Sequence, residues 1–372
     1  MKNWNFGQQT WSWSNIELLV KNHTFGQKSN FWSKIKLVEK SKFWRTLYQI
    51  QNLKESVKHV ALQFPEGLLL FATTIADLLE MFTGCICVIL GNVTYGACCV
   101  DDITAQMLTC SLLVHYGHSC LVPINKTNIQ TLYIFVDIEI DKMHFINSIR
   151  QNFPTGSRIA LISTIQFVAT LQSAATELVG YDIVLQHNQP LSPGEVLGCT
   201  APDVGNCDGL IYLGDGRFHL EAGMIANPTV QAYRYDPYDQ SFTKEGYDHD
   251  QMKANRRQQI EKAKSGKTFG IILSTLGRQG NPKIMDNLKR MLEKQNKKFI
   301  TILLPEIFPD KLELFDGIDV WIQIACPRLS IDWGMSFSKP ILTPYEGAVA
   351  LQSMDWIENV YPMDFYRLLL LS

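Results

Sequence analysis

One pattern of apolar and polar positions occurs three times along the chain. It begins near His59, Arg158 and Phe269 with a short apolar run. In each copy a turn follows, and then a stretch with apolar residues spaced three and four apart. Short apolar runs bounded by turn residues predict strands, and the wider spacing predicts amphipathic helices. The chain therefore contains a strand–turn–helix unit repeated three times.

Each unit continues with two further apolar runs. The second strands are expected at "CICVIL", "YDIVLQH" and "KFITILLP", and the third at "SLLVHYGH", "DGLIYLGD" and "DVWIQIAC". In the helix of the third unit, Ile284, Leu288, Met291 and Leu292 fall on one face. Because strands alternate with helices, the sheets should be mostly parallel.

This pattern predicts an α/β protein of three similar domains, each a mostly parallel sheet flanked by helices, arranged around a central site. The expected domains are residues 58–150, 151–265 and 266–372. Residues 1–57 form a separate aromatic, basic extension, which holds five of the eight tryptophans. Within it "SKIKLVEKSKFWRTLYQI" predicts a basic amphipathic helix that packs on the body. Binding to a membrane surface is the less supported alternative.

Composition narrows the function classes. The chain has 372 residues, 46% of them hydrophobic and 19% charged, with a net charge of −2. This balance gives no overall attraction to nucleic acid. No run of about 18 uncharged apolar residues occurs, and the first residues lack an apolar signal region, so we expect a cytoplasmic protein without a membrane span. In a reducing compartment, cysteines more often bind metal or react than form disulfides.

Cysteines follow predicted strands in all three domains. Cys98 and Cys99 lie in "YGACCVDD", Cys199 in "SPGEVLGCTAPD" and Cys326 in "WIQIACPRLSIDWG". Ligands of open parallel sheets bind beyond the carboxyl ends of the strands, so these loops are expected to converge. Thiolates suit zinc, copper or iron–sulfur clusters, and three of them leave a metal position open.

The alternative for these cysteines is that they are small buried hydrophobes, the usual state of a free cysteine. Turn residues beside them argue against this: Gly96, Gly198 and Pro327. Cys85 and Cys87 alternate within a predicted strand. No role is assigned to these two or to Cys110, Cys120 and Cys207.

Several weaker signals have structural readings. "SGKT" at 265–268 lacks the upstream glycine and strand of a phosphate-binding loop, so it indicates a linker. His115 and His118 have metal-like spacing, but a histidine lining the pocket is favoured over a zinc ligand. Asp101 and Asp102 are expected to cap the following helix.

Arg278 and Gln279 lie in the glycine-rich turn "GRQGNP" of the third domain. Its backbone N–H groups and guanidinium could bind a carboxylate or a ribose. An ordinary surface turn is an equally good reading.

Ordered motifs over residues 58–366 carry a family resemblance. They are "ALQFPEGLLLFA", "YGACCVDD", "HYGHSCLVPI", "SPGEVLGCTAP", "DGRFHLE", "YRYDP", "GRQGNP", "ACPRLSIDWG" and "KPILTPYE". Together they resemble the diphthamide synthase family, and most of all its eukaryotic catalytic branch.

The resemblance implies a 4Fe-4S cluster held by Cys98, Cys199 and Cys326, with Cys99 pointing elsewhere. Its open iron would bind S-adenosylmethionine. The cofactor-binding residues that we expect are Gly67, Tyr95, His118, Arg278, Gln279 and Gly280. No tight C-x₃-C-x₂-C motif is present, as separate domains require.

The implied reaction is the first step of diphthamide synthesis. Reductive cleavage of S-adenosylmethionine yields a 3-amino-3-carboxypropyl radical, which adds to a histidine of translation elongation factor 2, and methylthioadenosine is released. Expected partners are a paralogous second subunit, a small electron-donor protein and elongation factor 2. Two alternatives stay open: a non-catalytic scaffold or partner subunit with a structural or electron-relay cluster, and a zinc hydrolase using Cys98, His115 and His118.

Overall fold

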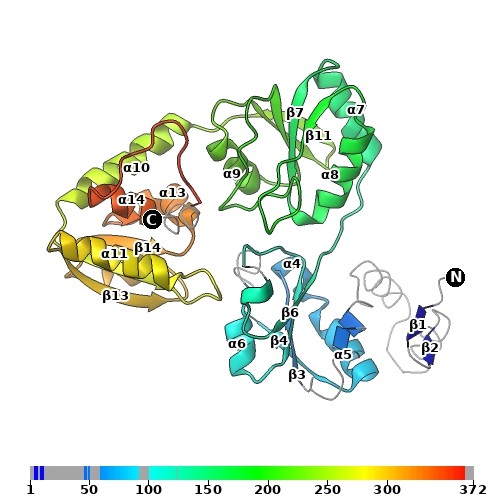
Figure 1. Ribbon diagram of the computed structural model, residues 1–372, viewed down its shortest axis with the longest axis horizontal. Helices are drawn as coiled ribbons and strands as arrows, with labels where there is room; N and C mark the ends of the chain where they lie inside the picture. The colour runs from blue at the N-terminus through cyan, green and yellow to red at the C-terminus, as the bar shows by residue number, and fades with distance from the viewer. Residues whose placement is uncertain are drawn as a thin grey trace. The chain divides into compact units, whose positions relative to one another are not determined.

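The computed structural model describes residues 4–6, 9–11, 46–47, 49–50, 59–91, 100–122 and 124–364. Three mostly parallel sheets follow one another along the chain, each with flanking helices (Figure 1). The predicted α/β class is therefore confirmed. None of the helices in the described ranges is long and apolar enough to cross a membrane.

The first sheet has the strand order β4-β3-β5-β6, with all strands parallel. The strands are β3 (His59–Gln63), β4 (Ile86–Leu90), β5 (Leu112–Tyr116) and β6 (Gln130–Ile134). The helices of this region are α4 (Glu66–Leu69), α5 (Ala72–Thr83) and α6 (Asp102–Met107), with a 3₁₀ turn at Ile124–Lys126.

The second sheet repeats this order as β8-β7-β9-β10 and adds the antiparallel edge strand β11. Its strands are β7 (Arg158–Ser163), β8 (Asp182–Val184), β9 (Gly209–Leu213), β10 (Ala232–Asp236) and β11 (Ser241–Glu245). The helices here are α7 (Lys142–Asn152), α8 (Ile165–Glu177) and α9 (Phe218–Ala226).

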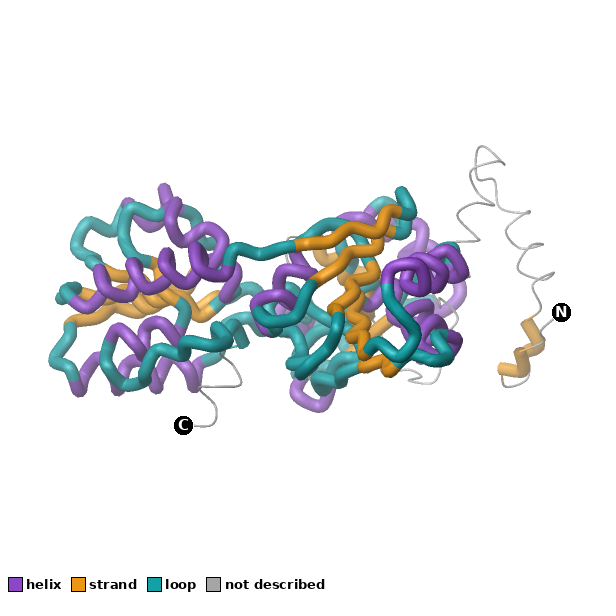
Figure 2. Tube along the Cα trace, turned by 90° about the horizontal axis from the view of Figure 1, so that it is seen from above, coloured by secondary structure: helices purple, strands orange, loops and turns teal. Residues whose placement is uncertain are grey.

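The third sheet has the order β13-β12-β14-β15, again all parallel. Its strands are β12 (Thr268–Ser274), β13 (Lys298–Leu304), β14 (Val320–Ile324) and β15 (Ile341–Leu342). The helices are α10 (His249–Lys264), α11 (Pro282–Lys294), α12 (Pro309–Glu313), α13 (Pro327–Trp333) and α14 (Pro344–Ala350), with a 3₁₀ turn at Gly334–Ser336. Figure 2 shows these strands between two layers of helices.

The common order explains the sequence repeat and also shows what the pattern missed. Each sheet has a fourth parallel strand, namely β6, β10 or β15. Two of these strands carry polar residues ("QTLYI" and "AYRYD") and the third has only two residues, so none gives a continuous apolar run. The amphipathic face of α11 is as expected, because Ile284, Leu288 and Leu292 are fully buried.

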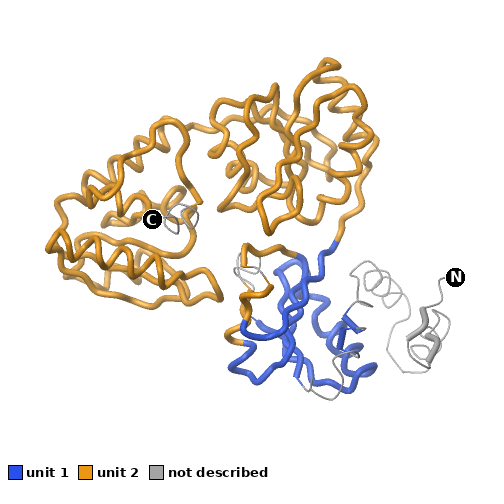
Figure 3. The backbone as a smooth tube through the Cα atoms, in the orientation of Figure 1, with its two compact units in different colours: residues 1–94, 105–117, 128–136 blue, residues 95–104, 118–127, 137–372 orange. Residues whose placement is uncertain are grey.

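The chain divides into two compact units (Figure 3). Unit 1 comprises residues 1–94, 105–117 and 128–136, which include the first sheet, and unit 2 comprises 95–104, 118–127 and 137–372. One hydrophobic cluster contains residues of both the second and the third sheet, which explains why these sheets belong to one unit. The three domain ranges given above stay a prediction.

The N-terminal extension is described only in part. Trp4–Phe6 (β1) and Gln9–Trp11 (β2) form an antiparallel pair, and residues 46–47 and 49–50 are helical. The rest of the expected amphipathic helix lies outside the described residues. Leu47 and Ile50 are buried in the hydrophobic cluster of the first sheet.

Candidate cofactor site

Unit 2 contains a cavity of about 890 Å³. Its walls come from the loops after β8, β12 and β14 and from Cys120, Leu121, Val122 and Lys126, which follow β5 in the chain. The carboxyl ends of parallel strands are where α/β proteins bind ligands, and this volume is typical of small-molecule and cofactor sites. The cavity is therefore the candidate cofactor site.

Cys199 lines this cavity from the tip of a tight turn. Leu197 and Thr200 exchange backbone hydrogen bonds of 3.1 and 3.4 Å, so Gly198 and Cys199 form the tip between them. A Cβ atom on Gly198 would lie 1.9 Å from Cε1 of Phe218. Only glycine fits beneath this ring, and the close approach fixes the turn on α9.

Cys326 lines the same cavity from the end of the third sheet. It is separated from the end of β14 by Ala325 and is the N-cap residue of α13, whose first residue is Pro327. The side-chain amide of Gln323 donates to its carbonyl at 2.8 Å. Burial raises the pKa of the Cys326 thiol, whereas the backbone N–H groups of Arg328 and Leu329 lower it. Metal binding must displace this proton, so binding should weaken in acid.

Arg328 ties the two cysteine loops together. Only 3% of its side chain is exposed. Its Nη1 donates to the carbonyl of Phe218 at 2.7 Å, and its guanidinium lies 4.3 Å from the centre of the Phe218 ring. It also binds Glu221 of α9 and Asp332 of α13. Because the Phe218 ring packs on Gly198, one buried guanidinium positions both the Cys199 turn and the start of α13.

The "GRQGNP" turn forms another wall of the cavity. Ser274, the last residue of β12, donates to the side chain of Gln279 at 3.1 Å. A Cβ atom on Gly280 would lie 2.2 Å from the carbonyl oxygen of Ser274. Asn281 accepts from the N–H groups of Lys283 and Ile284 and so caps α11. The expected residues Arg278, Gln279 and Gly280 thus all line the cavity.

Arg278 has a partner that the sequence did not indicate. Its Nε and Nη2 donate to the two carboxylate oxygens of Asp102 at 2.8 and 2.5 Å, across 176 residues of sequence. The Asp102 side chain is fully buried. The expectation that both aspartates simply cap a helix is therefore wrong for Asp102, whereas Asp101 does accept from the N–H of Thr104 at 3.1 Å.

The other expected residues are placed differently. Gly67 lies in α4, within unit 1. Burial lowers the pKa of His118, which also interacts electrostatically with His219 of α9. Neither residue belongs to the cavity lining. Tyr95, Cys98 and Cys99 lie outside the described residues.

The zinc alternative gains no support. His115 lies inside β5, is 1% exposed and binds Gln63 through Nδ1 at 2.8 Å. Within the described part of the chain, no three His, Cys, Asp or Glu side chains come close enough to hold a metal ion.

Cys120 is a cavity residue that the sequence reading missed. It is 6% exposed, and its sulfur accepts from the N–H of Val122 at 3.4 Å. The signal that could have indicated it is position in the chain, because Cys120 comes after the carboxyl end of β5, the third strand of the first sequence repeat. From the sequence alone it is assigned no role.

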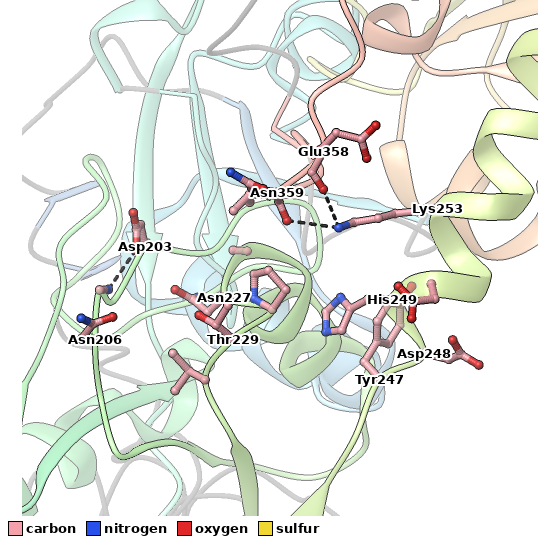
Figure 4. Close-up of a pocket in the computed structure, with 16 residues that line it drawn as sticks. Asp203, Asn206, Asn227, Thr229, Tyr247, Asp248, His249, Lys253, Glu358 and Asn359 are labelled. Atoms are coloured by element: carbon pink, nitrogen blue, oxygen red, sulfur yellow. Dashed lines mark hydrogen bonds between the residues drawn. The ribbon is translucent and has the colours of Figure 1, made fainter.

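A second cleft, of about 660 Å³, lies elsewhere in unit 2 (Figure 4). Its lining includes Asp203, Asn227, His249 and Lys253, and it contains no cysteine. Lys253 donates to the carbonyls of Glu358 and Asn359 at 2.7 and 3.2 Å. The cleft lacks the soft ligands of the large cavity, so it is not a candidate for an iron–sulfur group.

Comparison with known proteins identifies the family of the chain. The family model described as "Putative diphthamide synthesis protein" matches residues 64–362. The chain belongs to this family.

Relatives that share most of the chain carry a common name, 2-(3-amino-3-carboxypropyl)histidine synthase subunit 1. The protein of Nematostella vectensis is 60% identical over 87% of this chain and 69% of its own length. That of Homo sapiens is 55% identical over 87% and 74%. The crystal structure of Dph2 from Pyrococcus horikoshii with a 4Fe-4S cluster is similar in fold, with a TM-score of 0.71 and 26% identity, covering 86% of this chain and 92% of that one.

The residues of the cavity fit such a cluster. Two thiols from different sheets, Cys199 and Cys326, line one cavity that can hold a cofactor-sized group. Thiolates are the usual protein ligands of iron–sulfur clusters. Cys120 lines the cavity as well, but among the described residues no three such side chains come close enough to hold a metal ion. The expected third ligand, Cys98, lies outside the described residues.

Proposed function

We propose that this chain catalyses the first step of diphthamide synthesis, the transfer of a 3-amino-3-carboxypropyl group from S-adenosylmethionine to a histidine of translation elongation factor 2. One observation carries the proposal: Cys199 and Cys326, 127 residues apart in sequence, line one cavity at the carboxyl ends of two sheets. The names of the relatives support the same reaction.

Cys98, Cys199 and Cys326 are the proposed ligands of a 4Fe-4S cluster. When bound, the cluster supplies the electron that cleaves the bond between the sulfonium and the methionine γ-carbon. The chain contributes positioning: Phe218 and Gly198 hold the Cys199 turn, and Arg328 ties that turn to α13. A buried, fixed arrangement of this kind reduces the reorganisation that the reaction needs.

The "GRQGNP" turn is the proposed site for the methionine part of the substrate. Gln279 is 8% exposed and fixed on Ser274, and Gly280 allows the backbone to approach β12 closely. Arg278 is oriented by Asp102, so its positive charge lies at the cavity wall in one place. A carboxylate is the group that this charge would attract. The expected contacts of Gly67, Tyr95 and His118 with the cofactor stay predictions, since Gly67 and His118 do not line the cavity and Tyr95 lies outside the described residues.

The proposed partners are a paralogous second subunit, a small electron-donor protein and elongation factor 2. The shared name of the relatives, "subunit 1", supports a complex of more than one chain. Alone, the cluster-loaded chain should be poorly active, and full turnover without a partner would contradict this.

The deciding experiment mixes the reduced, cluster-loaded protein and its partner subunit with S-adenosylmethionine and elongation factor 2. Methylthioadenosine and a histidine carrying the 3-amino-3-carboxypropyl group should both form. Release of 5′-deoxyadenosine would show that another carbon–sulfur bond is cut and would overturn the mechanism. A scaffold would bind a cluster but cleave nothing.

A further inference from the structure

Two cysteines outside the cavity lie next to each other at the amino end of the first sheet. Cys85 stands between α5 and β4, and Cys87 is the second residue of β4. Their Sγ atoms are 3.8 Å apart. Residues two apart on an extended chain point to the same side, so the backbone itself brings these thiols together.

Side chains of the preceding helix hold the backbone of this pair. Glu80 accepts from the N–H of Cys87 at 2.8 Å, and Thr83 accepts from the N–H of Cys85 at 3.3 Å. Strand β4 is an edge strand of its sheet. Cys85 is 5% exposed, and Cys87 is only partly buried, so the pair is reached from the side of Cys87.

The two thiols influence each other's ionisation. A hydrogen bond with Cys87 lowers the pKa of Cys85 to about 7, while burial acts in the opposite direction. The same interaction, with burial, raises the pKa of Cys87. The contact between the two sulfurs therefore favours one thiolate in the pair and disfavours a second. The thiolate is the nucleophilic form of cysteine, and a neighbouring thiol can then resolve a mixed disulfide.

We propose that Cys85 and Cys87 form a thiol–disulfide exchange site, which reacts with a small disulfide and closes to an internal disulfide. One thiolate of the pair attacks a sulfur of the small disulfide RS–SR and releases RS⁻. The second cysteine loses its proton and attacks the protein sulfur of this mixed disulfide, releasing a second RS⁻. The protein loses two electrons and two protons, and RS–SR becomes two RSH. This site is independent of the function proposed for the cavity.

Other cysteines at amino ends of strands lack this arrangement. Cys110 precedes β5, is 4% exposed, and has a pKa raised by burial. Cys207 precedes β9, donates from its sulfur to the carbonyl of Val204 at 3.3 Å, and also has a pKa raised by burial. Cys207, whose thiol bonds to a carbonyl and not to a second sulfur, is the suitable control.

The main test treats the full-length protein with oxidised glutathione, blocks remaining thiols with N-ethylmaleimide and maps peptides by mass spectrometry. The peptide with both Cys85 and Cys87 should lose two hydrogen atoms and carry neither reagent. In Cys85→Ser and in Cys87→Ser, the remaining cysteine should hold one glutathionyl group instead. Cys207 should stay unoxidised. An unreacted Cys85–Cys87 peptide in the wild type, or a mixed disulfide that never closes, would overturn the proposal.

The pH dependence of the reaction shows whether the interaction between the two thiols, and not solvent exposure alone, makes this site reactive. In the wild type, the rate at the Cys85–Cys87 peptide should rise with a midpoint near pH 7. Cys87→Ala removes the hydrogen-bond donor and should move the midpoint toward that of an ordinary thiol, about 8.5. Cys87→Ser keeps a donor and should stay near the wild-type midpoint. Equal midpoints in the alanine and serine variants would contradict this effect of the contact between the two thiols.

A second probe requires both sulfurs at once. Phenylarsine oxide bridges two neighbouring thiols, so one phenylarsenic group should bind the peptide with Cys85 and Cys87. Neither single serine variant should retain it through a thiol wash. Circular dichroism of each variant controls for folding. Failure of the wild-type peptide to bind the arsenical would show that the sulfurs cannot act together.

Discussion

Cysteines at the two ends of the sheets have contrasting surroundings. At the amino ends, Cys85 and Cys110 are buried and Cys87 and Cys207 are partly buried, and none of these four lines the large cavity. At the carboxyl ends, the buried Cys120 and the partly buried Cys199 and Cys326 all line that cavity of about 890 Å³. The same residue type therefore packs against the sheet at one end and faces a binding space at the other.

The difference comes from the backbone around each thiol. A short helix-to-strand connection leaves the sulfur among core side chains. At the carboxyl ends, Gly198 beneath Phe218 and Pro327 at the start of α13 turn the chain away from the sheet. In a repeated α/β fold, the end of the strand is thus a better guide to a cysteine's role than its apolar neighbours are.

The largest expected effect is loss of activity when a cysteine at the carboxyl end of a strand is replaced. Cys199→Ser should abolish formation of methylthioadenosine and of the modified histidine, because a hydroxyl is a harder and much less acidic iron ligand than a thiol. Iron content and visible absorbance should fall, while the circular dichroism spectrum stays unchanged.

The matched control is Cys207→Ser, at the amino end of β9 in the same sheet. This variant should keep its iron and its activity. Equal iron loss in both variants would show that cysteines at the amino and carboxyl ends of the strands do not differ in their role.

A smaller effect is expected at Arg328, which joins the two cysteine loops. Arg328→Gln leaves Glu221 and Asp332 without their buried cation and should lower the free energy of unfolding by about 3 kcal/mol. Iron per protein should also fall, because the Cys199 turn and α13 lose their common anchor. Urea denaturation and iron analysis measure the two effects.

Lys264→Gln is the control for charge alone. Its pair with Glu261 is exposed, and its removal should change the free energy of unfolding by less than about 1 kcal/mol. If the Arg328 variant kept full iron despite its lower stability, Arg328 would stabilise the fold without positioning the site.

Acid should lower the free energy of unfolding through His219 of α9. Burial, with His118 and Arg328 nearby, lowers the pKa of His219 to about 4, below the value of about 6.5 for an unfolded chain. Between these two pKa values the unfolded state binds more protons than the folded state. The contribution of His219 to the free energy of unfolding is therefore fully present above pH 6.5 and is lost as the pH falls toward 4. The loss should be about 3 kcal/mol at most.

Urea denaturation from pH 7.5 to pH 4 measures this slope. His219→Gln should flatten it, because this variant lacks the imidazole whose pKa burial lowers. An unchanged slope in the His219 variant would assign the acid sensitivity to other groups.

The smallest effect concerns the turn under Phe218. Gly198→Ala places a methyl group 1.9 Å from the ring and should lower the free energy of unfolding by about 1–3 kcal/mol through overpacking. Gly246→Ala, with no atom within 4 Å of its Cβ, is the control. Adding Phe218→Leu should recover part of the loss, and strict additivity of the two substitutions would show that they do not touch.

The sequence determined the repeated elements, since these follow from local periodicity. Apolar runs of strand length and the helical face of Ile284, Leu288 and Leu292 could be read directly, and so could the loops that carry Cys199 and Cys326. Glycine and proline beside those cysteines indicated turns, because local backbone constraints act over a few residues. Ordered motifs also identified the family, which the comparisons confirm.

Only the tertiary structure decided which distant groups meet. The pairing of Asp102 with Arg278 spans 176 residues, and nothing in either local pattern encodes it. Cys120 joins the cavity, and Arg328 contacts Phe218, because particular loops of separate sheets pack against each other. The short or polar fourth strands β6, β10 and β15 likewise form only when a neighbouring strand offers its hydrogen bonds. Periodicity describes one element at a time, whereas a site is made where several elements end together.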